Sequence, residues 1–283
     1  MNIILDASGR VGSVLVQALS EKGQAVRAVL RNGKRADEFN GRGIDVRMAD
    51  FFDITALKTA FGGGEVLFLI TPENPASRDV LGETCQIIRN YREAITASGI
   101  RKIVGLSSMG AQHPSGTGNL EQSYMLEHAF VDLPVEQTFI RPAYYFSNWL
   151  GYRDTAGDYG ILPTFFPAGL KVQMVAPADV ANFALQLMMA DKPYKPFYEV
   201  GEKYYSSIEV ASVFGKKLQR NVEVQQIPRE QWEGTLSQVG FSENAATNLI
   251  KMTEAVLNGR TQPENPLEVV NMPTSLVSYF ETV

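Results

Sequence analysis

Apolar and polar residues alternate regularly over the first third of the chain. Residues 2–5 read as a buried strand, and further strand-like segments occupy residues 25–30, 44–48, 66–70 and 102–106. Amphipathic segments with the spacing of helices lie between them, at residues 10–22, 54–61 and 78–98. Strands that alternate with helices indicate a parallel sheet covered on both faces. The pattern therefore predicts a doubly wound α/β fold.

The rest of the chain is less regular. The same periodicities predict helices at residues 120–130 and 179–189, and strands at residues 135–140, 172–175, 197–200 and 222–226. Residues 151–169 are rich in glycine, proline and aromatic side chains, which favours a loop near a ligand cleft. We find no internal repeat and no long flexible linker.

Composition excludes several functional classes. The 283 residues carry a net charge of −5, so direct nucleic-acid binding is not expected. Cys85 is the one cysteine, which fits a reducing compartment, and with His113 and His128 it makes no zinc spacing. The N-terminus lacks the pattern of a signal peptide, and the longest apolar run, residues 66–70, is too short to cross a bilayer. We expect a cytoplasmic protein without a metal site.

The turn after the first predicted strand resembles a dinucleotide-binding turn. In IILDASGRVG, residues 3–12, Gly9 would let the backbone approach a pyrophosphate, and Gly12 would let the helix pack closely on the strand. The candidate phosphate-binding residues are Ser8, Gly9, Arg10, Val11 and Gly12. Asp6 stands where the first glycine of such a turn is expected, and its charge would repel the pyrophosphate. An ordinary glycine-containing turn is the alternative.

Further candidates follow the next strands, where open α/β sheets bind their ligands. Arg31 opens a basic stretch, residues 31–35, that suits the 2′-phosphate of NADP(H) better than the ribose of NAD(H). A solvated basic loop is the alternative. Asp50 and Phe51 would lie beside the adenine, and residues 71–72, Thr-Pro, would line the nicotinamide half. Each pair could instead be a helix cap or a turn.

The fifth strand leads into a serine- and glycine-rich segment, residues 105–119. It delivers Ser107 and Ser108 to the expected cleft, and the following loop is long enough to fold over a ligand. His113 in that loop is expected at the surface rather than in catalysis. Glu127, on the next helix, is expected at the helix surface or at an interface.

These motifs together resemble the NmrA-like group of atypical short-chain dehydrogenase/reductases. The resemblance covers nearly the whole chain and rests on ASGRVG, LFLITP, LSSMGAQHPSGTGN with LEHAF, TFIRPAYYFSNW and PADVANFALQLM. It implies a Rossmann-type sheet with a smaller, mostly helical C-terminal substrate lobe. The implied NAD(P)-binding domain spans residues 1–150, with residues 171–201 returning to its sheet. Residues 151–170 and 202–283 would form the substrate lobe.

The resemblance also implies where a cofactor lies and what the site lacks. The dinucleotide would extend across the glycine turn, Arg31, Asp50, Phe51, Thr71 and Pro72, with Pro142 near the nicotinamide. In catalytic relatives a tyrosine and a lysine act as proton donor and helper, but this chain has Asn119 and Ser123 there. Ser107, Ser108 and Tyr144 remain as catalytic candidates.

Members of the group are either NAD(P)H-dependent reductases, for example of quinones, or redox sensors that act through a protein partner. The sequence favours an NADPH-dependent reductase of a small quinone-like or other apolar acceptor, because hydride transfer to such an acceptor depends mainly on positioning. The alternatives are a non-catalytic dinucleotide sensor and a family member whose cofactor binding is weakened by Asp6.

Overall fold

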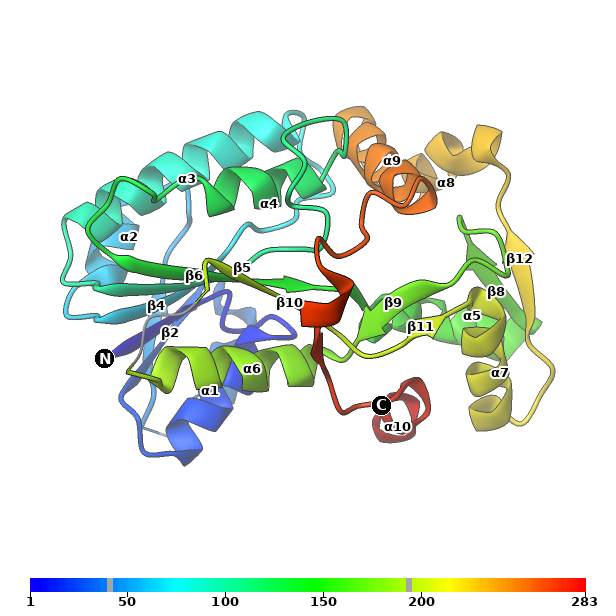
Figure 1. The fold of residues 1–283 in the computed structure, drawn as a ribbon, viewed down its shortest axis with the longest axis horizontal. Helices are drawn as coiled ribbons and strands as arrows, with labels where there is room; N and C mark the ends of the chain where they lie inside the picture. Colours follow the sequence, from blue (N-terminus) through cyan, green and yellow to red (C-terminus); the bar gives the residue numbers. More distant parts are fainter. Residues whose placement is uncertain (40–42, 192–194) are drawn as a thin grey trace.

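A parallel eight-stranded sheet forms the centre of the molecule (Figure 1). The computed structural model describes residues 1–39, 43–191 and 195–283. The strand order is β13-β10-β6-β5-β4-β1-β2-β3, and every paired neighbour runs parallel. The strands are β1 (Asn2–Leu5), β2 (Val26–Leu30), β3 (Asp45–Met48), β4 (Val66–Ile70), β5 (Lys102–Leu106), β6 (Glu136–Pro142), β10 (Phe197–Gly201) and β13 (Val270–Asn271). The predicted doubly wound fold is confirmed.

Helices cover both faces of this sheet, as Figure 1 shows. On one face lie α1 (Gly12–Glu21) and α6 (Pro177–Met189), and on the other lie α2 (Ile54–Phe61), α3 (Val80–Thr96) and α4 (Leu120–Glu127). Side chains alternate across each strand, so Ile4 joins the core beside α1 and α6 while Ile3 and Leu5 join the opposite core. Two buried layers therefore fix the sheet and leave its carboxyl edge to carry the site.

The remaining elements gather beyond that edge. Two small sheets lie there: one joins β7 (Tyr144–Tyr145), β9 (Val172–Val175) and β11 (Tyr204–Tyr205), the other β8 (Ile161–Thr164) and β12 (Glu223–Gln226). The helices are α5 (Arg153–Tyr159), α7 (Ser207–Leu218), α8 (Trp232–Gln238), α9 (Glu243–Leu257) and α10 (Leu276–Thr282). Short 3-10 turns are η1 (Gly33–Phe39), η2 (Phe146–Tyr152), η3 (Arg229–Gln231) and η4 (Pro266–Glu268).

The expected loop at residues 151–169 is wrong. This stretch contains α5 and β8, and Ala156 and Leu162 from it are fully buried in a third core around Trp149. Its strand pairs with β12, roughly sixty residues further along the chain. A partner so distant leaves no mark in the local pattern, and Pro163 in the middle of the strand argues against a strand there.

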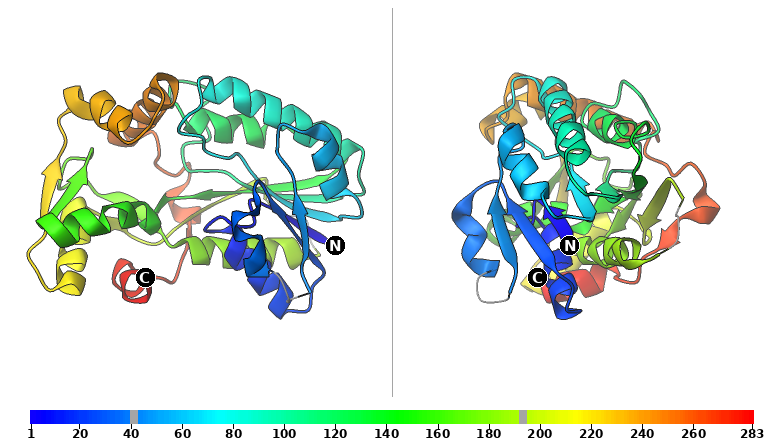
Figure 2. Two further views of the ribbon diagram at one scale, coloured as in Figure 1. Left: turned by 180° about the vertical axis from the view of Figure 1, so that it is seen from behind. Right: turned by 90° about the vertical axis from the view of Figure 1, so that its left-hand side faces the viewer.

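The chain returns to the main sheet near its end. Residues 258–272, which we call the C-terminal strap, run from α9 to β13, where Val270 pairs with Val200 of β10. Figures 1 and 2 show α8 and α9 on the same side of the sheet as α3 and α4. The Ser242 backbone before α9 donates to the Pro75 carbonyl at 2.9 Å, so α9 also supports the loop after β4. None of the described helices is long and apolar enough to cross a bilayer.

Candidate functional site at the carboxyl edge of the sheet

The turn between β1 and α1 is folded tightly upon itself. The amide of Gly9 donates to the Asp6 carbonyl at 2.8 Å, and Asp6 adopts the left-handed backbone conformation, with φ of 50°. A Cβ atom at Gly9 would lie 2.2 Å from Oδ2 of Asp6, and one at Gly12 would lie 2.3 Å from its carbonyl oxygen. The backbone contact therefore requires glycine at position 12, whereas a side chain at position 9 would force the Asp6 carboxylate to move. Aspartate tolerates the left-handed conformation at position 6 better than most residues.

The Asp6 carboxylate has a cationic partner. Its Oδ1 atom lies 3.4 Å from Nη2 of Arg31, at the end of β2, and both side chains are partly exposed. The Arg31 guanidinium lies 5.9 Å from the centre of the Phe51 ring. The structure thus brings Asp6 together with the residue expected to hold a 2′-phosphate. The negative charge of Asp6 is therefore partly offset by Arg31 within the protein.

The basic stretch after β2 is also internally paired. Arg35 bonds to the Ser8 carbonyl and to both Glu38 carboxylate oxygens, at 2.5 and 2.7 Å. The hydrogen bond from Arg35 holds the pKa of Glu38 below its usual range. The side chain of Lys34, which belongs to the predicted basic stretch, lies outside the described part of the structure. Arg31 and Arg35 therefore present cations that already have carboxylate partners.

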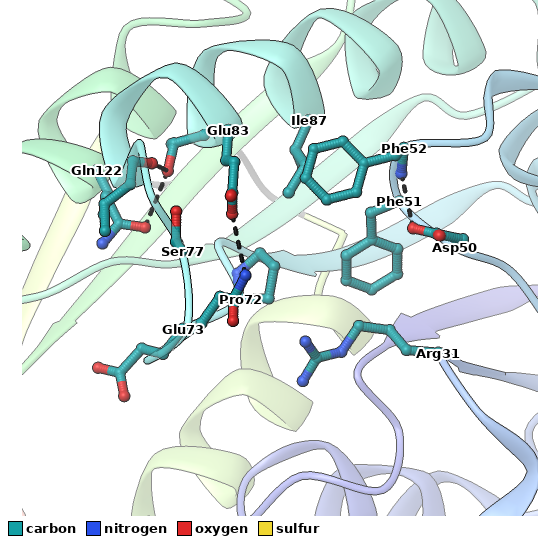
Figure 3. Close-up of a pocket in the computed structure, with 13 residues that line it drawn as sticks. Arg31, Asp50, Phe51, Phe52, Pro72, Glu73, Ser77, Glu83, Ile87 and Gln122 are labelled. Atoms are coloured by element: carbon teal, nitrogen blue, oxygen red, sulfur yellow. Dashed lines mark hydrogen bonds between the residues drawn. The ribbon is translucent and has the colours of Figure 1, made fainter. Parts of the chain in front are cut away.

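A recess of about 200 Å³ opens beside Arg31 (Figure 3). Arg31 and Phe51 project into it from the ends of β2 and β3, and Pro72 closes it from the end of β4. Asp50 accepts a hydrogen bond from the Phe52 amide at 3.0 Å and so stabilises the turn after β3. Phe51 is almost fully buried against Tyr91, with ring centres 5.6 Å apart. Phe51 therefore belongs to the core as well as to the recess wall.

Glu73 also lines the recess. In Figure 3 its carboxylate points away from Arg31. Glu73 is exposed to solvent at the recess, yet desolvation by its neighbours raises its pKa, while the charge of Arg10 lowers it. Arg10 donates to Ser147 Oγ at 2.8 Å and so links the glycine turn to η2. One cation and one carboxylate therefore face each other across the cleft.

A cluster of aromatic side chains lies within range of the charge of Glu73. The ring of Tyr144 packs edge-on against Trp149 and Phe166, with centres 5.9 and 5.7 Å apart. Burial raises the pKa of Tyr144 and of Tyr145, and the charge of Glu73 raises both further. Among the described residues, the Tyr145 hydroxyl and the Trp149 indole nitrogen are buried without a hydrogen-bond partner. This aromatic cluster is largely apolar and poor in available protons.

Thr71 and Pro142 frame the cleft through the backbone. Thr71 directly follows β4 and is half-buried. Pro142 ends β6, and its carbonyl accepts the Met109 amide at 3.1 Å, which fixes the loop after β5. The structure therefore places both predicted residues at the carboxyl edge of the sheet.

Ser107 does not stand alone at the end of β5. Its hydroxyl donates to Oε1 of Glu127 at 2.6 Å, and Glu127 in turn receives two hydrogen bonds from Arg141, at 2.6 and 2.8 Å. The Ser108 hydroxyl bonds only to the neighbouring Met109 carbonyl, at 3.1 Å. The Ser107 proton is therefore committed to a carboxylate that is itself held by a cation.

The expectation that Glu127 lies at the helix surface or an interface is wrong. Its side chain is 7% exposed and that of Arg141 is 4% exposed. Arg141 also pairs with Glu264 of the C-terminal strap, lies 3.8 Å from Glu199 of β10, and stacks on Phe197. A charged residue within the apolar strand TFIRP was the available signal, because a buried arginine needs carboxylate partners.

The loop after β5 is fastened by the strap. Arg260 donates to the carbonyls of Ser115 and Gly116 at 3.0 and 2.8 Å, and the His113 ring contacts the Arg260 carbonyl at 3.0 Å. Sequence reasoning missed Arg260 entirely. His113 is half-buried in this contact. It has a structural role.

The positions of the missing tyrosine and lysine offer no substitute chemistry. Asn119 lies at the start of α4, and its side-chain oxygen Oδ1 is buried without a hydrogen-bond partner among the described residues. Ser123 is buried within the same helix. No cluster of potential metal ligands occurs among residues 1–39, 43–191 and 195–283.

The profile of the NmrA-like family matches residues 3–275. The chain belongs to the NmrA-like family. It is 25% identical to quinone oxidoreductase 2 of Escherichia coli over 252 residues, 88% of this chain and 85% of that protein. It is 24% identical to an NAD(P)H azoreductase of Xenophilus azovorans over 248 residues, 87% of this chain and 84% of the relative.

A solved structure of the E. coli quinone oxidoreductase, complexed with NADPH, has the same fold. The TM-score is 0.83 at 23% sequence identity, and the match covers 100% of this chain and 99% of that one. The fold of this NmrA-like protein is therefore that of an enzyme known to hold NADPH. The residues described above lie at the carboxyl edge of the sheet in this protein.

Proposed function

We propose that this NmrA-like protein is an NADPH-dependent reductase of small, flat, quinone-like acceptors. The observation that carries the proposal is the recess at the carboxyl edge of the sheet, which Arg31 and Glu73 line, together with an aromatic cluster around Tyr144 that feels the charge of Glu73. The glycine turn is linked to Arg31 through Asp6 and suits a pyrophosphate in its backbone geometry. The relatives are reductases, so they give no support to a non-catalytic sensor.

The scarcity of side chains that can donate a proton favours quinones over simple carbonyl compounds as acceptors. Bound NADPH supplies a hydride. A ketone also needs a proton at its oxygen, but Ser107 donates its own to Glu127, and Tyr144 and Tyr145 hold theirs tightly. A quinone that accepts a hydride becomes a hydroquinone anion, which takes its proton from water. The residues of this cleft then need only to bind and orient the acceptor.

The test is NADPH oxidation by the purified protein with menadione as acceptor and with a simple aromatic aldehyde for comparison. We expect turnover with menadione and none with the aldehyde. Arg31→Ala should weaken NADPH binding about ten- to a hundred-fold, because a charge-assisted hydrogen bond to the 2′-phosphate is lost, and should leave NADH nearly unchanged. Tight NADPH binding without menadione turnover would contradict the proposal.

A paired substitution checks the proton argument. Ser107→Ala combined with Ser108→Ala should lower menadione turnover less than about ten-fold, because neither hydroxyl supplies a proton. The readout is kcat and KM for menadione at saturating NADPH. A loss on the order of 10⁴-fold would show that one of these serines takes part in acid–base catalysis.

A further inference from the structure

Two carboxylates pair with Arg31 and Arg35, the cations at the end of the cleft where the 2′-phosphate is proposed to bind. Asp6 Oδ1 lies 3.4 Å from Arg31 Nη2, and Glu38 receives two hydrogen bonds from Arg35. Arg35 also reaches back to the Ser8 carbonyl in the glycine turn. The two ion pairs are thus joined through the turn itself.

The backbone holds Asp6 in this arrangement. Its φ of 50° and the hydrogen bond from Gly9 fix the direction in which the side chain leaves the turn. The second carboxylate oxygen lies so close to Gly9 that a Cβ there would approach it to 2.2 Å. Asp6 is therefore held firmly in the turn, and its other carboxylate oxygen, Oδ1, faces Arg31.

We propose that Asp6, assisted by Glu38, acts as an internal counter-anion that a 2′-phosphate must displace, and that Asp6 thereby sets how strongly the protein prefers NADPH over NADH. The inference rests on the proposed use of NADPH. NADH lacks the 2′-phosphate and leaves the Asp6–Arg31 pair intact. NADPH must exchange one anion for another at Arg31, so the net gain from its phosphate is reduced.

This role differs from repulsion of the pyrophosphate, which the sequence suggests for the same residue. Repulsion at the pyrophosphate would weaken both dinucleotides equally, because both carry that group. Competition for Arg31 weakens NADPH alone. The two effects of Asp6 are therefore separable by comparing the two cofactors.

The experiment measures the Kd values of NADPH and NADH by nicotinamide fluorescence, without any acceptor, for the unmodified protein and for Asp6→Asn. Asparagine keeps the left-handed turn and removes only the charge. NADPH should bind at least about three-fold more tightly to the variant, as expected for loss of a partly exposed ion pair, while the Kd of NADH changes less than about two-fold. Glu38→Gln should act in the same direction. Asp6→Gly provides a second variant of the turn with unrestricted φ.

Glu21→Gln is the matched control, because it removes one exposed carboxylate at the far end of α1. It should leave both Kd values unchanged. Equal tightening of NADPH and NADH by Asp6→Asn would overturn the proposal in favour of pyrophosphate repulsion, and unchanged affinities would overturn it as well. A protein that shows the expected shift but reduces no quinone contradicts the proposed function alone.

Discussion

Glu73 is a carboxylate whose protonation depends on its surroundings in the cleft. Desolvation raises its pKa in the folded protein above the value of a solvated glutamate. A carboxyl group whose pKa is higher in the folded than in the unfolded protein stabilises the fold at pH values below its unfolded pKa. This stabilisation is lost as the pH rises through its folded pKa. The ionised carboxylate is therefore a small cost to folding at neutral pH.

Replacement of Glu73 by glutamine should remove this cost. The melting temperature of Glu73→Gln should exceed that of the unmodified protein at about pH 7, and the gap should close toward about pH 4. Thermal unfolding across that range is the measurement. A gap that widens as pH falls would show that the ionised form of Glu73 is favoured by the fold.

Single residues also show how far local sequence reasoning reaches at the site. The glycine turn and Arg31 were predictable, because each follows directly from a strand and a turn within a short stretch. The ion pair of Asp6 with Arg31, and the burial of Glu127 against Arg141, were not. Those contacts depend on which strand ends meet across the sheet, and a local pattern does not contain that information.

At the scale of elements, the C-terminal strap and the loop after β5 form one unit. Arg260→Ala removes two hydrogen bonds from a charged donor to loop carbonyls, which should cost about 1–3 kcal/mol of unfolding free energy. Amide hydrogen exchange should accelerate over residues 108–119. Lys58→Ala, which breaks an exposed ion pair with Glu93, should cost less than about 1 kcal/mol. Equal effects of the two variants would mean that Arg260 does not fasten the loop.

The elements that the sequence predicted well are those that carry a strong local pattern of apolar residues. Strands β1, β2, β4 and β5 are almost entirely buried, so runs rich in apolar residues mark them. The strands at residues 144–145 and 161–164 are short and mix buried with half-buried residues, and they pair with segments about 30 to 60 residues away. Their existence is decided by tertiary packing, which overrides local propensity.

Across the whole molecule, Arg141 is the point where sheet, helix and C-terminus meet. It pairs with Glu127 of α4 and Glu264 of the strap and lies near Glu199 of β10. Burial raises the pKa of Glu199, and the charge of Arg141 lowers it. A single cation thus serves three carboxylates in a largely buried region.

Loss of that cation should be severe. Arg141→Met should lower the free energy of unfolding by about 3–5 kcal/mol, because it leaves buried carboxylates without a counter-charge. Urea unfolding at neutral pH is the measurement. Glu199→Gln is the contrasting variant: it keeps an acceptor for the Glu264 amide, bound at 3.0 and 3.1 Å, and should leave stability unchanged or raised. A milder loss in Arg141→Met than in Glu199→Gln would contradict this account.

The position of β13 has a consequence for biosynthesis. Residues 258–272 supply the outer neighbour of strand β10 and two of the hydrogen bonds that hold the loop after β5. A ribosome that is still translating this region therefore holds a nascent sheet with an open edge, which can pair with other chains. Prematurely terminated chains should accordingly aggregate or be degraded rather than accumulate as partly folded protein.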